Sequence, residues 1–132
     1  MPKFTFEKIR AITAGQHKIL QLQIDGKRQF DSFETELKGT DYEIEYAQLT
    51  SWLDYYCKTG IIANGRLKEL QRNKKDPIKE FEFRTTNLRF YAIQGVTGKI
   101  IILCGYKKNQ KEELKKFRAL KKQIFHTSTK QR

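Results

Sequence analysis

The feature that most restricts the fold is a run of four large aliphatic residues, Ile100-Ile101-Ile102-Leu103, between two turn-forming segments. A strand with one face in water alternates apolar and polar residues, whereas a strand covered on both faces is continuously apolar. Residues 99–104 therefore predict a central strand. Any fold for this chain must place that strand inside a sheet, with packed elements on both sides.

Two strands and a basic helix flank this segment. Residues 81–84 alternate Phe with Glu and Arg, which is the period of a half-buried strand, and residues 88–94 are rich in β-prone residues. A Gly-flanked turn at residues 95–98 leads into the central strand. From Asn109 to Phe125 apolar residues recur at helical spacing, while the opposite face is almost wholly Lys and Arg. The second half of the chain thus predicts three consecutive strands and a basic helix.

The first half of the chain predicts two strands and two helices, over residues 3–12, 18–24, 29–38 and 41–58. The third of these segments also fits a returning strand, and we prefer the helix because Phe30, Phe33 and Leu37 share one helical face. The helix over 41–58 carries an aromatic stripe that we interpret as core. Residues 61–78 predict a loop with one helical turn at Leu67–Leu70.

The charge is distributed unevenly along the chain. The formal net charge is +12, but residues 1–60 hold 8 basic and 9 acidic side chains, whereas residues 99–132 hold 11 and 2. Such a gradient predicts one strongly positive face, and nucleic acid is the commonest partner of such a face. The alternative is a solvated lysine surface that binds nothing.

Cysteine usage and hydropathy indicate the compartment. Cys57 and Cys104 belong to no CxxC motif, so we expect two reduced thiols that pack as small apolar groups. No apolar run approaches the roughly 18 residues that a membrane-spanning helix requires, and the first residues lack the apolar core of a signal peptide. We therefore expect a cytoplasmic protein without a membrane contact.

The residues suited to chemistry are cations. The sequence contains no nucleotide-binding or metalloprotease motif, and neither of its two histidines, His17 and His126, suits a general base. We expect no metal and no cofactor. Cations suit phosphodiester recognition, and they can support RNA cleavage in which the 2′-hydroxyl attacks its own adjacent phosphate. The alternative for Arg84 and Arg89 is that they are solvated strand residues that pair with Glu80 and Glu82.

Four sequence elements occur in a telling order: residues 81–84 (Phe-Glu-Phe-Arg), 89–91 (Arg-Phe-Tyr), the apolar run, and residues 105–111 (Gly-Tyr-Lys-Lys-Asn-Gln-Lys). Together they resemble the RelE/HigB-like superfamily of bacterial and phage toxins, especially its phage-derived branch. That branch has a WELR-like strand, an R-x-x-Y strand, an apolar strand and a GF-x-KK-x-Q-K entry to a basic helix. Here the tyrosine of the second element stands one place early.

The resemblance implies an α+β fold in which a small antiparallel curved sheet packs against N-terminal helices and a basic C-terminal helix. We expect one domain over residues 1–125. Within it residues 1–16 form an N-terminal extension strand, and residues 126–132 form a disordered tail.

The resemblance also implies a function. It predicts the toxin of a type II toxin-antitoxin system, acting as a metal-independent, ribosome-dependent mRNA endoribonuclease. Its partners are the ribosome, mRNA and a cognate helix-turn-helix antitoxin, and we expect a monomer alone and a hetero-oligomer with antitoxin. The implied catalytic residues are Arg84, Arg89 and Lys108. The implied RNA-binding residues are Tyr106, which could stack on a base, with Lys107, Lys111 and Lys79.

Two departures from the family pattern keep a second function open. Glu80 and Glu82 stand on the first strand of the hairpin, where relatives carry lysines, and Leu114 stands where others carry a tyrosine. Lys74, Lys75 and Lys79 could supply cations from the preceding loop. The alternative is a catalytically weak or inactive RelE/ParE-like protein that inhibits a protein target such as gyrase, or one that only binds nucleic acid.

Overall fold

The computed structural model describes residues 2–12 and 15–130, with side chains as far as Phe125. Its strands are β1 (Phe4–Lys8), β2 (Lys18–Ile24), β3 (Lys27–Arg28), β4 (Leu67–Glu69), β5 (Glu80–Arg84), β6 (Leu88–Gln94) and β7 (Gly98–Tyr106). Its helices are α1 (Gln29–Leu37), α2 (Glu43–Thr59), the 3₁₀ turn η1 (Lys107–Asn109) and α3 (Gln110–Lys130). The strands form one seven-stranded sheet in the order β1-β2-β7-β6-β5-β4, with β3 paired to β2.

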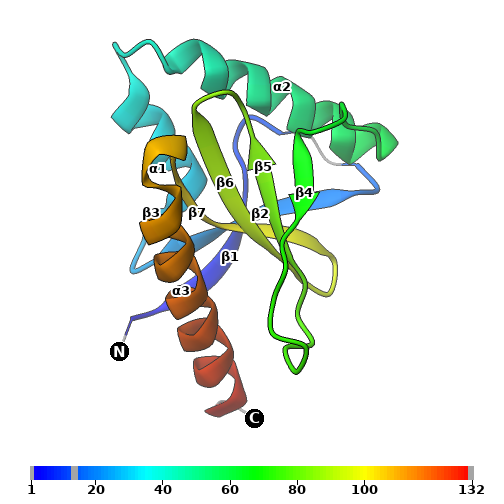
Figure 1. Ribbon diagram of the computed structural model, residues 1–132, viewed down its shortest axis with the longest axis vertical. Coiled ribbons are helices and arrows are strands. Elements are labelled where there is room, and N and C mark those ends of the chain that lie inside the picture. Colours follow the sequence, from blue (N-terminus) through cyan, green and yellow to red (C-terminus); the bar gives the residue numbers. More distant parts are fainter. Residues whose placement is uncertain (1, 13–14, 131–132) are drawn as a thin grey trace.

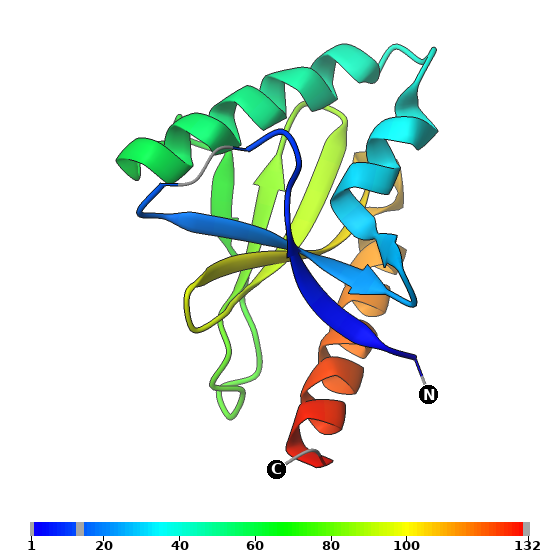
Figure 2. The ribbon, with the colours of Figure 1, turned by 180° about the vertical axis from the view of Figure 1, so that it is seen from behind.

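The helices cover both faces of this sheet, with α1 and α2 on one face and α3 on the other (Figures 1 and 2). The predicted central strand is β7. Ile101 packs with α1 and α2, whereas Ile100 and Ile102 pack with Phe117 of α3. The fully apolar run is thus explained by alternate residues that enter two different cores. The α+β class and the packing of a small sheet on helices are confirmed.

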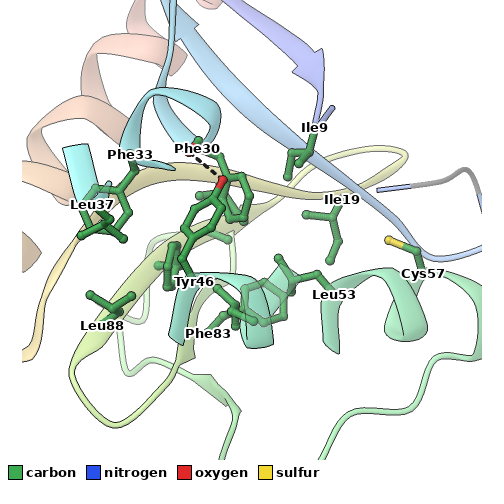
Figure 3. Close-up of a cluster of buried hydrophobic side chains, with 14 residues drawn as sticks. Ile9, Ile19, Phe30, Phe33, Leu37, Tyr46, Leu53, Cys57, Phe83 and Leu88 are labelled. Atoms are coloured by element: carbon green, nitrogen blue, oxygen red, sulfur yellow. Dashed lines mark hydrogen bonds between the residues drawn. The ribbon is translucent and has the colours of Figure 1, made fainter. Parts of the chain in front are cut away.

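Aromatic side chains fill the core on the α1/α2 face (Figure 3). The Tyr46 hydroxyl donates a hydrogen bond to the carbonyl oxygen of Phe30 at 3.2 Å, which joins α2 to the start of α1. The Phe30 ring lies 5.6 Å from the Phe90 ring on β6. The aromatic stripe of the second helix is therefore core, as its spacing predicts.

The sheet is mixed, so the expectation of an antiparallel sheet is wrong in one place. β2 pairs with β7 in parallel, with Leu20 opposite Ile100, while the other pairs are antiparallel. The β5–β6–β7 strands are joined by tight turns that impose the antiparallel direction. Two helices and four strands lie between β2 and β7 in the chain, so no turn fixes the direction in which they pair.

The predicted helical turn at Leu67–Leu70 is also wrong, because Leu67–Glu69 forms strand β4. β4 pairs with β5 in antiparallel register, with Leu67 opposite Phe83. The hydrogen-bonding edge of β5 would otherwise be open, and pairing with it outweighs the weak local preference of three residues. β4 is the last strand on that side of the described sheet.

The two ends of the chain follow the predictions in part. β1 lies at the sheet edge, antiparallel to β2, within the segment 1–16 that we expect to form an extension strand. Residues 1 and 13–14 of that segment lie outside the described residues. α3 continues past its predicted end at Phe125 to Lys130. Residues 131–132, the remainder of the expected disordered tail, also lie outside the described residues.

The cysteines behave as predicted, as free thiols inside the fold. Cys57 is buried and Cys104 is half-buried, and neither forms a disulfide. Burial raises the pKa of both thiols, which keeps them protonated and unreactive.

Candidate nucleic-acid interface

The predicted catalytic segments meet at one end of the sheet, where β5 and β7 end and β6 begins. Arg84 lies opposite Arg89 in the β5–β6 register, and Arg89 lies opposite Gly105 in the β6–β7 register. The Lys107 amide donates to the carbonyl oxygen of Asn87 at 2.8 Å, which fixes the start of η1 against the β5–β6 turn. The backbone thus brings all the segments together as expected, and the side chains decide which groups are available.

Arg89 is not available to a ligand in this structure. Its side chain is 7% exposed, and Nη1 donates to the carbonyl oxygens of Thr85 at 2.6 Å and Leu88 at 2.8 Å. Its Nε lies 3.8 Å from Oε1 of the buried Glu82. The Arg89 guanidinium therefore stabilises the β5–β6 turn and neutralises a buried carboxylate. It pairs with Glu82, as in the alternative interpretation, but it is buried and not solvated.

Arg84 is partly available, since its side chain is 33% exposed. Its Nε donates to the carbonyl oxygen of Gly65 at 2.8 Å, and its Nη1 lies 3.7 Å from Glu82 Oε2. Directly opposed residues of an antiparallel pair point to the same face. Arg84 and Arg89 therefore share the face of Glu82 and Tyr91, and the Tyr91 ring stacks on Phe117 of α3 at 5.6 Å. Both arginines belong to the α3 face of the sheet.

Tyr106 and Lys108 lie toward the other face. The Tyr106 ring contacts Phe33 at 5.6 Å and Tyr42 at 5.5 Å between ring centroids, and its hydroxyl donates to Glu36 at 2.9 Å. Burial, with this hydrogen bond, raises the pKa of Tyr106 to about 12. Its ring is thus occupied by the protein itself and does not stand free for a base. The exposed Lys108 ammonium lies 5.5 Å from the Tyr106 ring centre, so it is drawn toward the α1/α2 face.

The other predicted RNA contacts divide into two places. Lys107 and Lys111 are exposed beside Lys108, on η1 and the first turn of α3. Lys79 is exposed just before β5, about 16 Å from Arg84 at the 3.3 Å rise of a strand. Of the predicted site residues, the accessible cations at the sheet end are Arg84, Lys107, Lys108 and Lys111. Arg89 and the Tyr106 ring are occupied by contacts within the protein, and Lys79 lies away from the sheet end.

A layer of buried polar groups lies under the start of α3. Gln110 Nε2 donates to Glu82 Oε1 at 2.7 Å, and the Tyr106 amide donates to Glu113 Oε2 at 3.2 Å. The Glu113 carboxyl occupies the space that a side chain at Gly105 would fill. Burial raises the pKa of Glu113. These contacts fix the backbone of η1 and of the first turn of α3 at the sheet end.

A second polar cluster, centred on Lys121 of α3, holds the β4–β5 loop. Lys121 is 6% exposed at its side chain, and its ammonium donates to Asp76 Oδ2 at 2.5 Å, the Ile78 carbonyl oxygen at 2.7 Å and Glu80 Oε2 at 3.1 Å. Arg118 adds bonds to Glu80 at 3.0 Å and to the Gln71 carbonyl oxygen at 2.6 Å. Burial acts to raise the pKa of Asp76, but the hydrogen bonds and the charge of Lys121 hold it below its ordinary value.

Between this loop and the second half of α3 lies a cavity of about 870 Å³, which we call the α3 groove. The loop and the end of α3 project from the same side of the molecule in both views (Figures 1 and 2). Its cations are Arg72, Lys75, Arg118, Lys121 and Lys122, and its apolar wall is Pro77, Ile78 and Phe125.

The sequence contains one sign of this groove, a lysine on the apolar stripe of the C-terminal helix. Lys121 lies four residues after Phe117 and three before Ile124, which places a lysine on the buried stripe of the helix. A lysine in such a place requires a carboxylate partner. Glu80, on the α3 face of β5, is that partner.

No protein-family model, curated protein or solved structure significantly matches this chain. The likeness to the RelE/HigB-like toxins therefore rests on the motif residues given above.

Among the described residues, no helix combines the length and the apolar character needed to cross a membrane. The same part of the chain holds no group of three or more His, Cys, Asp or Glu side chains that could bind a metal ion.

Proposed function

We propose that this chain is an RNA-binding toxin that cleaves mRNA on the ribosome without a metal, and that a cognate antitoxin neutralises it. The observation that carries the proposal is the row of exposed lysines Lys107, Lys108 and Lys111, fixed at the end of the sheet. Their backbone is anchored on both sides, by the Lys107 amide at Asn87 and by Gln110 at Glu82. Because this backbone is already fixed, binding of a polyanion would restrict only the lysine side chains. The order of the motif residues supports the same class of protein.

The arrangement suggests a division of roles at the sheet end. Lys108 is the cation that would stabilise the charge on the phosphorane when the 2′-hydroxyl attacks the adjacent phosphate and the P–O5′ bond breaks. Arg84, which lies on the α3 face of the sheet, would bind another phosphate of the same strand. Lys107 and Lys111 would bind neighbouring phosphates. Arg89 is a positioning residue in this proposal, because it holds the β5–β6 turn that carries Arg84. Ribosomal RNA or the mRNA itself would supply any further acid or base.

A purified translation system tests the proposal. The full chain should cut mRNA only when ribosomes are present, as mapped by primer extension. Lys108→Ala should reduce the cutting rate by roughly a hundred- to a thousandfold. Arg84→Ala should reduce it by a smaller factor, because it removes only a phosphate contact on the α3 face. Lys27→Ala, which removes an exposed charge on β3, is the matched control and should cut at the normal rate. Cutting by Lys108→Ala at the rate of the unaltered chain would overturn the assignment of this residue.

A second candidate function is favoured by the burial of Arg89 against Glu82. In it the chain binds nucleic acid, or inhibits a protein target such as gyrase, without cleaving RNA. The same assay separates the two candidates. Intact mRNA with ribosomes present, together with either salt-sensitive RNA binding or inhibition of DNA supercoiling, supports the second.

A further inference from the structure

The α3 groove is large enough for a small ligand and lies apart from the sheet end. Its volume of about 870 Å³ falls in the range of about 300–1,000 Å³ that is typical of ligand sites. It is built from the β4–β5 loop and the second half of α3, whereas the lysines of the sheet end lie on η1 and the first turn of α3. The groove is therefore a separate place on the same basic helix.

The acidic groups of the groove are already neutralised by the protein. Asp76 and Glu80 both accept hydrogen bonds from Lys121, and Glu80 also pairs with Arg118 at 3.0 Å. The rim cations Lys75 and Lys122 are both exposed. Since five cations and two carboxylates line the groove, its net charge is positive and suits an anionic ligand.

The backbone of the groove offers few free groups to a ligand. The carbonyl oxygens of Gln71, Asp76 and Ile78 accept hydrogen bonds from Arg118, Arg72 and Lys121 respectively. These bonds also fix the loop, so the groove is formed before a ligand arrives. The groove is lined by the apolar side chains of Pro77, Ile78 and Phe125 and by the exposed cations Lys75 and Lys122, and Ile78 and Phe125 also pack against the core.

We infer that the α3 groove binds one nucleotide of single-stranded RNA, with the base against the apolar wall and the flanking phosphates on Lys75 and Lys122. Aromatic side chains and cations together are the usual means of holding an unpaired base and its backbone. An extended acidic peptide fits less well, because it binds best where free peptide groups continue a strand. This inference rests on the proposed function, and it adds a second RNA contact distant from the site of cutting.

Binding of a labelled short oligouridylate to the full chain, followed by fluorescence anisotropy over a range of salt concentrations, tests the inference. The double variant Lys75→Ala/Lys122→Ala should bind more weakly, and the slope of log Kobs against log salt should decrease in magnitude by about 1.4, since each single-strand phosphate contact contributes about 0.7. Phe125→Leu keeps an apolar side chain but loses the ring face, so it should bind roughly tenfold more weakly with an unchanged slope.

The control Lys18→Ala/Lys27→Ala removes the same charge from exposed residues of β2 and β3. It should bind nearly as tightly as the unaltered chain at about 0.15 M salt, where distant charges are screened. Circular dichroism verifies that every variant is folded. Equal binding by the unaltered chain and both groove variants overturns the inference and leaves the proposed function standing. A complete lack of RNA binding by the unaltered chain overturns both.

A labelled oligoglutamate peptide provides the competing outcome. Binding of this peptide that depends on Lys75, Lys122 and Phe125, together with oligouridylate binding that does not, would assign the groove to an acidic protein partner and reject the RNA inference.

Discussion

Replacing Lys121 with methionine should remove a large part of the stability of this chain. Methionine keeps the length and apolar stem of the lysine but loses the ammonium, which donates to Asp76, Ile78 and Glu80. Glu80 is almost fully buried, so it cannot recover its solvation by turning outward. It keeps one partner, Arg118, at 3.0 Å. Asp76 is 29% exposed and can be solvated again by water.

These contacts set the size of the effect. Breaking a buried ion pair by removing one partner typically costs about 3–5 kcal/mol, and the remaining Arg118 contact and the exposure of Asp76 place Lys121→Met near the lower limit, at about 3 kcal/mol. With a urea m-value of about 1.5 kcal/mol/M, that corresponds to a decrease of about 2 M in the unfolding midpoint. Lys122→Met changes an exposed neighbour on the same helix and should alter the free energy of unfolding by less than about 0.5 kcal/mol.

Urea unfolding followed by far-ultraviolet circular dichroism measures both variants. The loss of unfolding free energy in Lys121→Met should become smaller in acid. The pKa of Asp76 in the folded chain lies below its ordinary value of 3.8, so the Asp76 carboxylate stabilises the fold fully above pH 3.8. This stabilisation, and with it part of the difference between the two chains, disappears as the pH falls through the lowered pKa. A loss of less than about 1 kcal/mol at neutral pH, or a deficit of the same size at every pH, would refute the view that Lys121 stabilises the loop through buried charge pairs.

Two further substitutions probe other contacts. Glu45→Gln should lower the free energy of unfolding by about 1 kcal/mol at neutral pH, because the Glu45 carboxylate accepts bonds from Thr85 and Asn87. Those bonds outweigh burial and lower the pKa of Glu45, so the difference from the unaltered chain should vanish as the pH falls below the ordinary value of 4.5. Gly105→Ala should cost about 1–2 kcal/mol, because the new Cβ overlaps the Glu113 carboxyl, and Glu113→Ala should relieve most of that cost.

Urea unfolding at several pH values checks both predictions. For Glu45→Gln, a loss of unfolding free energy that becomes larger in acid would contradict the prediction, because a carboxylate with a lowered pKa stabilises the fold less as the pH falls. For Gly105→Ala, equal destabilisation with and without the Glu113 side chain would show that the overlap is not the cause.

The central strand could be predicted because its continuous aliphatic sequence matches what a strand covered on both faces requires. An uninterrupted aliphatic run of this kind has few places to lie except between two cores, and the structure divides Ile100 to Ile102 between them. β4 could not be predicted in this way. Its three residues contain one apolar side chain, Leu67, and they become a strand only because β5 offers an open edge.

At the candidate site the sequence predicts where the backbone segments lie, but not which groups the side chains contact. The sequence placed Arg84, Arg89 and Lys108 at strand ends, and they do lie at one end of the sheet. Whether Arg89 faces a ligand or Glu82 depends on which face α3 covers, and that is a property of the packed structure. The motif alone leaves both possibilities open.

The pairing of β2 with β7 also constrains when this chain can fold. Lys18 is joined to Gly98 across a separation of about 80 residues, and no nearer segment takes that position beside β2 on the described sheet. During synthesis the β2 edge that pairs with β7 therefore stays unpaired until β7 has left the ribosome. Contacts between such distant segments slow folding and expose the chain to aggregation in the meantime. A fragment that stops before residue 98 lacks the strand that joins β2 to β6.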